Sequence, residues 1–485
     1  MKGRERTVIV LMTVSLLATL GLGSAAAYAL THAGSATVSY RIGSGAAAEA
    51  GATPAASAAA TGVPGAPTPG SSAAAASSGG GTTATNVSNG GSAGSAAVPG
   101  INNSQNFVHN GVITVGGIFD ESGPLDATVE RDTVRAYFDQ VNAAGGVNGS
   151  KLQLIDCDSA FNPSTAHSCS QRLLSQGVLA IVGWTSVSGE QTEAPYLDTQ
   201  TASCPQCGIP IFGGLGVDAE FQSPLSFPVA DSLGRQGYAG ATRLCALGYQ
   251  HAAVVYLTAS FAASVNGGIL KGLATCGQHP TGNDDVAVDI ANQQDYSSIV
   301  TPWLADGTKS VLPALDPFSM ARLYQAMERD QFNPPMIGAG LDKTGAEGAY
   351  GSNFKGVQSF TPVLEPVGHT DNPAMADYLN TVKQYYPSQV SHGNLDVYTE
   401  EQWIAAHVFV AALRAIKGPV TRAALVSAAQ SLSNFDTGGL TRPLTYGHGG
   451  LNDPNHWVQW MHNPTGKADG WVTDSDWVDI PYNPS

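Results

Sequence analysis

The chain has 485 residues and a formal net charge of −16, from 38 acidic and 22 basic side chains. Nucleic acids and anionic membranes bind proteins through basic faces, so this charge argues against either as a partner. The length is too great for one small hydrophobic core and favours two folded lobes.

The first 29 residues have the pattern of a secretory signal peptide. Lys2, Arg4 and Arg6 precede an apolar run over residues 8–22, and small residues lead to Ala29. This order predicts export and cleavage after Ala29. The apolar run is short for a membrane span of about 20 residues, and an uncleaved anchor is the alternative. We therefore expect the protein outside the cytoplasm, secreted or held at the cell surface.

About three quarters of residues 30–110 are alanine, glycine, serine, threonine or proline, and only Arg41 and Glu49 are charged. Such a composition cannot bury enough apolar surface to offset the loss of chain entropy. We expect a disordered linker here, followed by the folded part from Gly111 to the end.

The folded part opens with a strand, a helix and a strand. β-Branched residues predict a buried strand over Val112–Ile118. Apolar residues at helical spacing begin at Thr128 and stop before Gly145. Residues Lys151–Asp156 then predict a second strand. Such a unit of about forty residues predicts two parallel strands with a crossover helix.

Two segments of this unit resemble the substrate-binding proteins of branched-chain amino acid ABC transporters. They are FDESGP at residues 119–124 and VNAAGGVNGSKL at residues 141–152. The resemblance extends to about Leu432. It implies the α/β fold of type I periplasmic binding proteins, in which two Rossmann-like lobes with parallel sheets are joined by a multi-strand hinge.

The resemblance and the alternation of predicted elements divide the folded part into four segments. We expect the first part of lobe 1 at 111–230 and lobe 2 at about 231–356. A return through the hinge and the completion of lobe 1 are expected at 357–434. The C-terminal extension, 435–485, is a candidate third crossing, and we expect its tryptophans to pack across lobe 1. Its histidines fit no short metal-binding template, so no metal or other cofactor is expected.

Six cysteines lie in the folded part, and an even number behind an export signal predicts three disulfides. Fifteen pairings are possible, and we favour the one that joins sequence neighbours. The predicted pairs are Cys157 with Cys169, Cys204 with Cys207, and Cys245 with Cys276. The Cys204–Cys207 pair leads into a strand instead of opening a helix, which favours a structural role over a redox-active one.

Ligands of open parallel sheets bind beyond the carboxyl ends of the strands. The loops after the predicted strands therefore supply the candidate ligand-binding residues. These are Asp120, Ser122, Trp184, Ser186, Ser188, Gly214, Gly216, Phe261, Asp316 and Asp342.

The resemblance gives some of these residues roles. In amino-acid-binding members of the family, hydroxyls and backbone amides of the first lobe hold the α-carboxylate, and a carboxylate holds the ammonium group. Ser186 and Ser188 match the donor positions, whereas Gly214–Gly216 replaces the usual Ala-Thr and supplies amides but no hydroxyl. Phe261 stands where a tyrosine is common, and the usual acid is displaced, which leaves Asp342 as the nearest candidate to bind an ammonium group. This pattern predicts an organic acid in preference to leucine or valine.

Each assignment has a structural alternative. Serines after a strand often cap the next helix. Phe261 could pack between the lobes, and Asp120 and Asp316 could stabilise turns.

The sequence thus predicts a monomeric solute-binding protein that delivers a small molecule, amino-acid-like or an organic acid, to an ABC transporter permease. A ligand-sensing receptor module is the first alternative. A secreted enzyme is the second, but no nucleophile, base and orienting group can be placed together in the sequence.

Overall fold

A computed structural model of the chain describes residues 105–198, 204, 207–338, 355–366, 368–447, 453–467 and 469–482. The predicted signal segment, the predicted linker up to residue 104, Asp342 and His448 lie outside these ranges. Within them, no helix is both long and apolar enough to cross a membrane.

The predicted strand, helix and strand open the structure. They are β2 (Val112–Phe119), α2 (Thr128–Ala143) and β3 (Lys151–Asp158). β2 and β3 pair in parallel along their full length, which confirms the predicted unit. Gly145 and Gly146 follow the helix at φ values of 105° and 81°. Only glycine adopts such angles without strain, which explains why the helix stops there.

The first sheet has six strands in the order β1-β2-β4-β5-β6, with β3 beside β2. All pairs are parallel except that of β1 with β2. The added strands are β1 (Val108–His109), β4 (Ile181–Thr185), β5 (Ile211–Phe212) and β6 (Ser226–Phe227). The predicted linker therefore ends too late, since β1 and the buried side chain of Phe107 already belong to the folded part.

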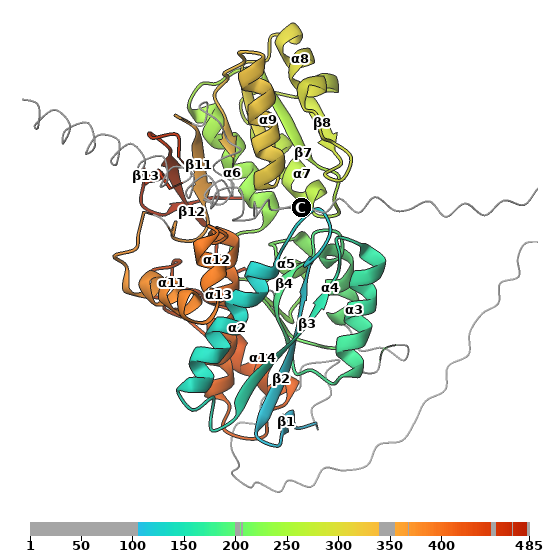
Figure 1. Ribbon diagram of the computed structural model, residues 1–485, viewed down its shortest axis with the longest axis vertical. Coiled ribbons are helices and arrows are strands. Elements are labelled where there is room, and N and C mark those ends of the chain that lie inside the picture. The colour runs from blue at the N-terminus through green and yellow to red at the C-terminus, as the bar shows by residue number, and fades with distance from the viewer. Residues whose placement is uncertain are drawn as a thin grey trace, which may run out of the picture. The chain divides into compact units, whose positions relative to one another are not determined.

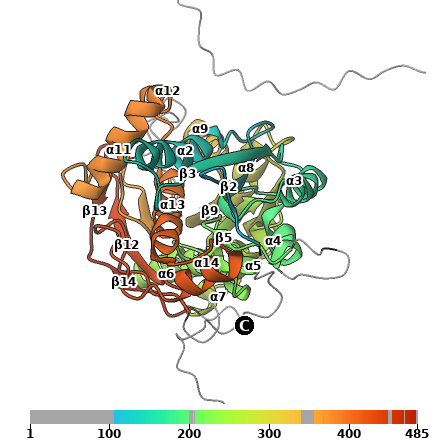
Figure 2. The ribbon, with the colours of Figure 1, turned by 90° about the horizontal axis from the view of Figure 1, so that it is seen from below.

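Helices cover both faces of this sheet, and this set of elements is called the first lobe below (Figures 1 and 2). On one face α2 packs with three helices from much later in the chain. On the other face lie three helices that follow α2 within residues 163–222. The late helices are α11 (Pro373–Tyr385), α13 (Val397–Ala415) and α14 (Arg422–Gln430), with the short α12 (Pro387–Ser391) beside α11. The other face carries α3 (Pro163–Ser175), α4 (Glu190–Asp198) and α5 (Asp218–Gln222).

A second set of elements, called the second lobe, contains two smaller sheets. The parallel sheet β8-β7-β9 continues through the bridge between Val311 and Met336 toward a mixed sheet in the order β10-β11-β12-β13, with β14 beside β12. The strands are β7 (Ala252–Leu257), β8 (Asp285–Val288), β9 (Ser310–Ala314), β10 (Ile337–Gly338), β11 (Gln358–Thr361), β12 (Trp457–His462), β13 (Val472–Thr473) and β14 (Val478–Asp479). The helices are α6 (Leu233–Ala246), α7 (Ala262–Ala274), α8 (Ser297–Asp306), α9 (Pro317–Arg329) and the 3₁₀ turn η1 (Gly282–Asp284).

Helices α6 and α7 approach each other closely because both carry glycines at their contact. A Cβ atom on Gly268 would lie 1.9 Å from the carbonyl oxygen of Gly234, so no other residue fits there without moving the backbone. The disulfide between Cys245 and Cys276 joins the ends of the same two helices.

All three predicted disulfides are present, with the pairs Cys157–Cys169, Cys204–Cys207 and Cys245–Cys276. Cys204–Cys207 lies ahead of β5 and both residues are buried, which fits the structural role that the sequence favoured.

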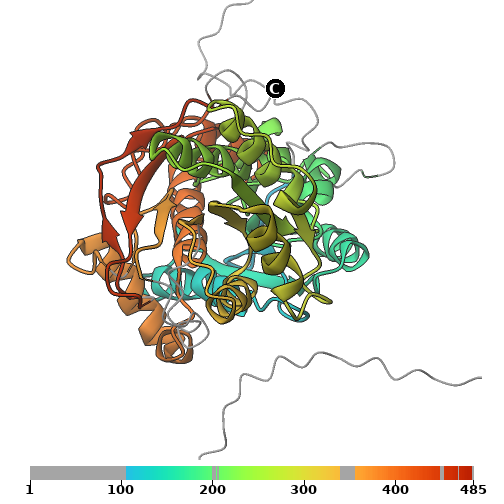
Figure 3. The ribbon, with the colours of Figure 1, turned by 90° about the horizontal axis from the view of Figure 1, so that it is seen from above.

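Within the described residues, the chain passes between the lobes at three places: between β6 and α6, between β11 and α11, and between α14 and β12. The prediction that the tail packs its tryptophans across the first lobe is wrong. β12 pairs with β11 in the second lobe, and the ring of Trp460 packs edge-on against Phe360. Figure 3 shows these late strands, in red, beside the helices of the second lobe. The pairing joins residues about a hundred positions apart, which alternation within the tail alone could not indicate.

Candidate functional site

One large cavity in the described part of the chain is lined by residues of both lobes, at the ends of β2, β4, β7, β9 and β10. Its volume is about 170 Å³. The position agrees with the rule that ligands bind beyond the carboxyl ends of parallel strands.

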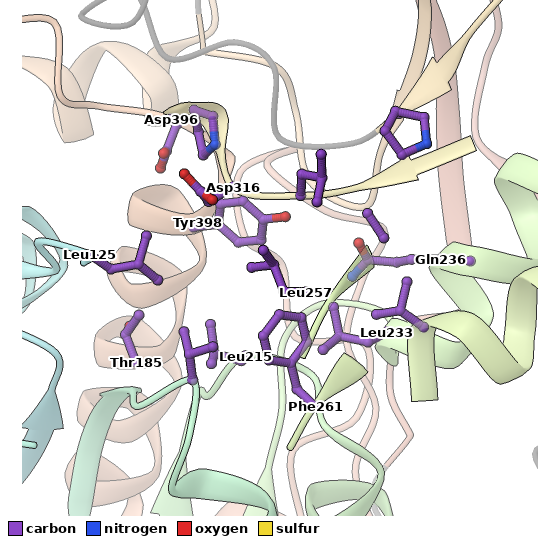
Figure 4. Close-up of a pocket in the computed structure, with 18 of the residues that line it drawn as sticks. Leu125, Thr185, Leu215, Leu233, Gln236, Leu257, Phe261, Asp316, Asp396 and Tyr398 are labelled. Atoms are coloured by element: carbon purple, nitrogen blue, oxygen red, sulfur yellow. The ribbon is translucent and has the colours of Figure 1, made fainter. Parts of the chain in front are cut away.

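Most of the wall is apolar (Figure 4). The first lobe contributes Leu215, whereas Leu233, Leu257 and Phe261 come from α6, β7 and the residue before α7. Further apolar side chains of the wall are Leu125, Val187, Val265, Ile269, Leu312, Ala314, Leu315, Phe318, Ile337 and Phe360. Such a surface favours a ligand with a substantial apolar part.

Three polar side chains lie together on one side of the cavity. Figure 4 shows Asp316, Asp396 and Tyr398 on the same side of the view, away from Phe261 and Leu233. Asp316 caps the N-terminus of α9, where its side chain accepts hydrogen bonds from the backbone amides of Phe318 and Ser319 at 3.0 and 3.1 Å. Asp396 caps α13 by accepting from the amide of Thr399. Two helix N-termini, one from each lobe, thus bring carboxylates to the cavity.

Asp120 lines the cavity, as the sequence predicted, but its oxygens are bonded within the protein. Oδ1 accepts hydrogen bonds from the Ser159 hydroxyl and the Phe161 amide, and Oδ2 accepts from the Val187 amide. Burial raises the pKa of Asp120 above its ordinary value, and the hydrogen bonds oppose that shift. These contacts connect the end of β2 to two neighbouring loops. They correspond to the alternative role of Asp120, in which it stabilises turns.

Four other predicted residues do not line the cavity. Trp184 is fully buried in a hydrophobic cluster on the side of the sheet that carries α3 and α4. The Ser122 hydroxyl donates to Asp158 at 2.5 Å. Ser186 is also fully buried, and its carbonyl accepts the amides of Gly189 and Glu190 at the start of α4. Ser188, the fourth, is half-buried. The Ser186 hydroxyl has no hydrogen-bond partner among the described residues, so its side chain neither caps α4 nor reaches the cavity wall.

The predicted donor loop at Gly214–Gly216 also directs its amides inward. The Leu215 amide donates to Glu190, and the Gly216 amide donates to Oε1 of Glu220 at 2.7 Å. A Cβ atom on Gly214 would lie 2.3 Å from Oε1 of Glu190, so the close approach requires glycine. These contacts leave the side chain of Leu215 as the part of the loop that lines the cavity.

Glu190 and Glu220 are both fully buried, and their carboxyls lie beside each other beneath this loop. Burial raises the pKa of Glu220 to about 7. Burial and the neighbouring negative charge raise the pKa of Glu190 well above its ordinary range. Two carboxyls this close share a proton because both cannot be ionised in a buried site.

Of the ten residues that the sequence proposed, Asp120, Phe261 and Asp316 line the cavity, and Asp342 lies outside the described residues. The sequence-based selection missed Thr185, Gln236, Asp396 and Tyr398, which also line it. A signal existed for two of them. Thr185 lies between two selected residues, Trp184 and Ser186, at the end of β4, and Asp396 precedes Thr399 in a capping pattern at the start of α13.

Comparisons with known proteins agree with this architecture. The sequence profile of a family described as periplasmic binding protein matches residues 112–459. A search of curated proteins found no match.

Solved structures with the same fold include a possible leucine/isoleucine/valine-binding protein from Rhodopirellula baltica SH 1. It is 20% identical, with a TM-score of 0.65 over 77% of this chain and 98% of that one. A fatty acid ABC transporter substrate-binding protein from Thermomonospora curvata is 18% identical, with a TM-score of 0.64 over 78% of this chain and 94% of that one. A solute-binding protein of an ABC transporter from R. palustris, solved in complex with benzoate, is 17% identical, with a TM-score of 0.61 over 75% of this chain and 98% of that one.

Proposed function

The chain belongs to the periplasmic binding protein family, and we propose that it captures a small molecule outside the cytoplasm and presents it to an ABC transporter. The main support for the proposal is the cavity, because its wall is formed by residues of both lobes. In the described part of the chain, three crossings join these two lobes. A wall divided between two lobes can hold a solute when they are together and release it when they part.

The apolar wall supports a ligand with an apolar body. The fatty acid and the benzoate named for two similar structures are molecules of this kind. From the sequence-based set we retain Phe261 and Asp316 as ligand contacts, and we add Leu215 and Thr185. The hydroxyl of Thr185 is buried and has no hydrogen-bond partner among the described residues, so it is available to a ligand.

The sequence predicted a carboxylate as the polar end of the ligand. Two of the amides on which that prediction depended bond to Glu190 and Glu220, and Ser186 does not reach the cavity wall. Amino-acid-like molecules and organic acids therefore both enter the test below.

The test is a thermal-shift screen of the intact protein against small amines, amino acids and organic acids with apolar bodies. Binding should raise the melting temperature, since a ligand at a hundred times its Kd stabilises the folded state by about 2.7 kcal/mol. Ala314→Trp should abolish every such shift, because Ala314 lines the cavity at the end of β9 and the indole would fill the space.

Ala274→Trp, at the exposed end of α7, is the matched control and should respond like the natural protein. If no solute class shifts the melting temperature of the natural protein, or if Ala314→Trp responds fully, the cavity is not the binding site.

A further inference from the structure

We infer that the ligand carries a protonated amino group, and that Asp316 is the residue that binds it. The inference rests on the proposed function, since it assigns the polar end of the solute that the cavity would hold. Its basis is one buried carboxylate oxygen and the charge of the cavity wall.

Asp316 uses only half of its carboxylate within the protein. Oδ1 caps α9 by accepting two backbone amides, whereas Oδ2 has no hydrogen-bond partner among the described residues. The residue is only 9% exposed and lines the cavity. A buried carboxylate oxygen without a donor is costly, so a donor from the ligand is the natural complement.

A helix cap alone does not require this arrangement. Asn162 and Asn372 cap α3 and α11 by accepting two amides in the same way, without a charge. At Asp316 the cap leaves a second, charged oxygen buried and without a donor among the described residues, on the polar side of the cavity. That oxygen is the feature of the site that a purely structural role leaves unexplained.

The other charged side chains of the described wall are also acidic. Asp126, Glu130 and Asp396 also line the cavity, and the described part of its wall contains no lysine, arginine or histidine. A ligand carboxylate near Asp316 would be repelled, and no basic side chain of the described wall would compensate. A cation would be attracted to the same place.

The remaining groups define the rest of the molecule. Phe261, Leu233 and Leu257 offer an apolar and partly aromatic surface, and the unpartnered hydroxyl of Thr185 offers one weaker polar contact from the first lobe. The ligand class is therefore a protonated primary or secondary amine on an aliphatic or aromatic body. The sequence instead predicted an organic acid, because the sequence alone gave no clearly placed partner for an ammonium group.

The experiment is isothermal titration calorimetry of the intact protein with probes that differ mainly at the polar end. One series is 2-phenylethylamine, 2-phenylethanol and phenylacetate, and the other is hexylamine, hexanol and hexanoate. In at least one series the amine should bind at least ten times more tightly than the alcohol, and the acid should bind most weakly.

Asp316→Asn is the decisive variant, because asparagine caps a helix as well as aspartate and removes only the charge. It should weaken amine binding roughly ten- to a hundredfold, which corresponds to losing a hydrogen bond to a charged group, and should affect alcohol binding much less. Asp330→Asn removes a charge at the other end of α9, outside the cavity wall, and should change neither.

The outcomes separate this inference from the proposed function. If alcohols or acids bind and the amines do not bind better, or if Asp316→Asn keeps the affinity for amines, the inference is wrong and the proposed function stands. If no probe of any charge binds to the natural protein, both are wrong.

Discussion

At the scale of single residues, the two buried glutamates decide what the Gly214–Gly216 loop does. Their carboxyls accept the amides of Leu215, Gly216 and Val217, which holds the Leu215 side chain in the cavity wall. Each pKa is raised mainly by burial, and the negative charge of Asp120 adds to the shift at Glu190. The folded protein therefore keeps a proton that an unfolded glutamate, with a pKa of 4.5, would release.

The sign of the pH dependence follows from the raised pKa. The stability contributed by this proton is complete below pH 4.5 and is lost as the pH rises through about 7. Glu190→Gln removes one of the two raised carboxyls and can keep its hydrogen bonds, while Glu220 still titrates. As the pH rises from about 5 to 8, the variant should lose less free energy of unfolding than the natural protein, because the raised pKa of Glu190 no longer contributes.

Urea unfolding at several pH values measures this difference. Glu328→Gln, on the exposed side of α9, is the control and should keep the natural pH profile. Equal slopes for Glu190→Gln and the natural protein would show that the pair does not share a proton.

At the scale of elements, one asparagine joins the three crossings between the lobes. Asn455 is fully buried ahead of β12, and its side-chain amide donates to the carbonyls of Val229 and Pro362 at 3.3 and 2.9 Å. These carbonyls belong to the first and second crossings, and Asn455 itself belongs to the third. Arg235 of α6 adds contacts to Asp453 and to the Asn455 carbonyl.

Asn455→Ala should therefore destabilise the protein by about 1–3 kcal/mol, because two buried carbonyls lose their donor. Chemical unfolding measures the change, and Asn292→Ala, at an exposed residue, should change stability by less than about 0.5 kcal/mol. A cost for Asn455→Ala as small as that of the control would mean that the crossings are not joined through this side chain.

At the scale of the whole molecule, we expect the N-terminal segment to decide where the protein works. We propose that residues 1–29 direct export and that the mature chain begins at Leu30. N-terminal sequencing of the protein recovered outside the cytoplasm should find Leu30. Leu16→Arg interrupts the apolar run and should keep the protein inside the cell, since the export signal depends on that run. Exported protein that retains Met1 would instead support the anchored alternative.

The sequence by itself determined the properties that depend on local pattern. The period of apolar residues and the glycines after α2 specified the first strand, helix and strand, and sequence proximity was enough to pair the cysteines. The strand-end rule placed Asp120, Phe261 and Asp316 at the cavity for the same reason, because each directly follows or lies near the end of a strand.

Only the tertiary structure decided which face a side chain uses and which groups meet. All five residues of β4 are buried, so no alternation in the sequence could tell that Thr185 lines the cavity while Trp184 packs in the cluster behind it. The amides of the Gly214–Gly216 loop were predicted as ligand donors, but those of Leu215 and Gly216 donate to Glu190 and Glu220 instead. Likewise β12 finds its partner about a hundred residues earlier in the chain. Contacts between distant segments depend on packing, and no local period of the sequence records them.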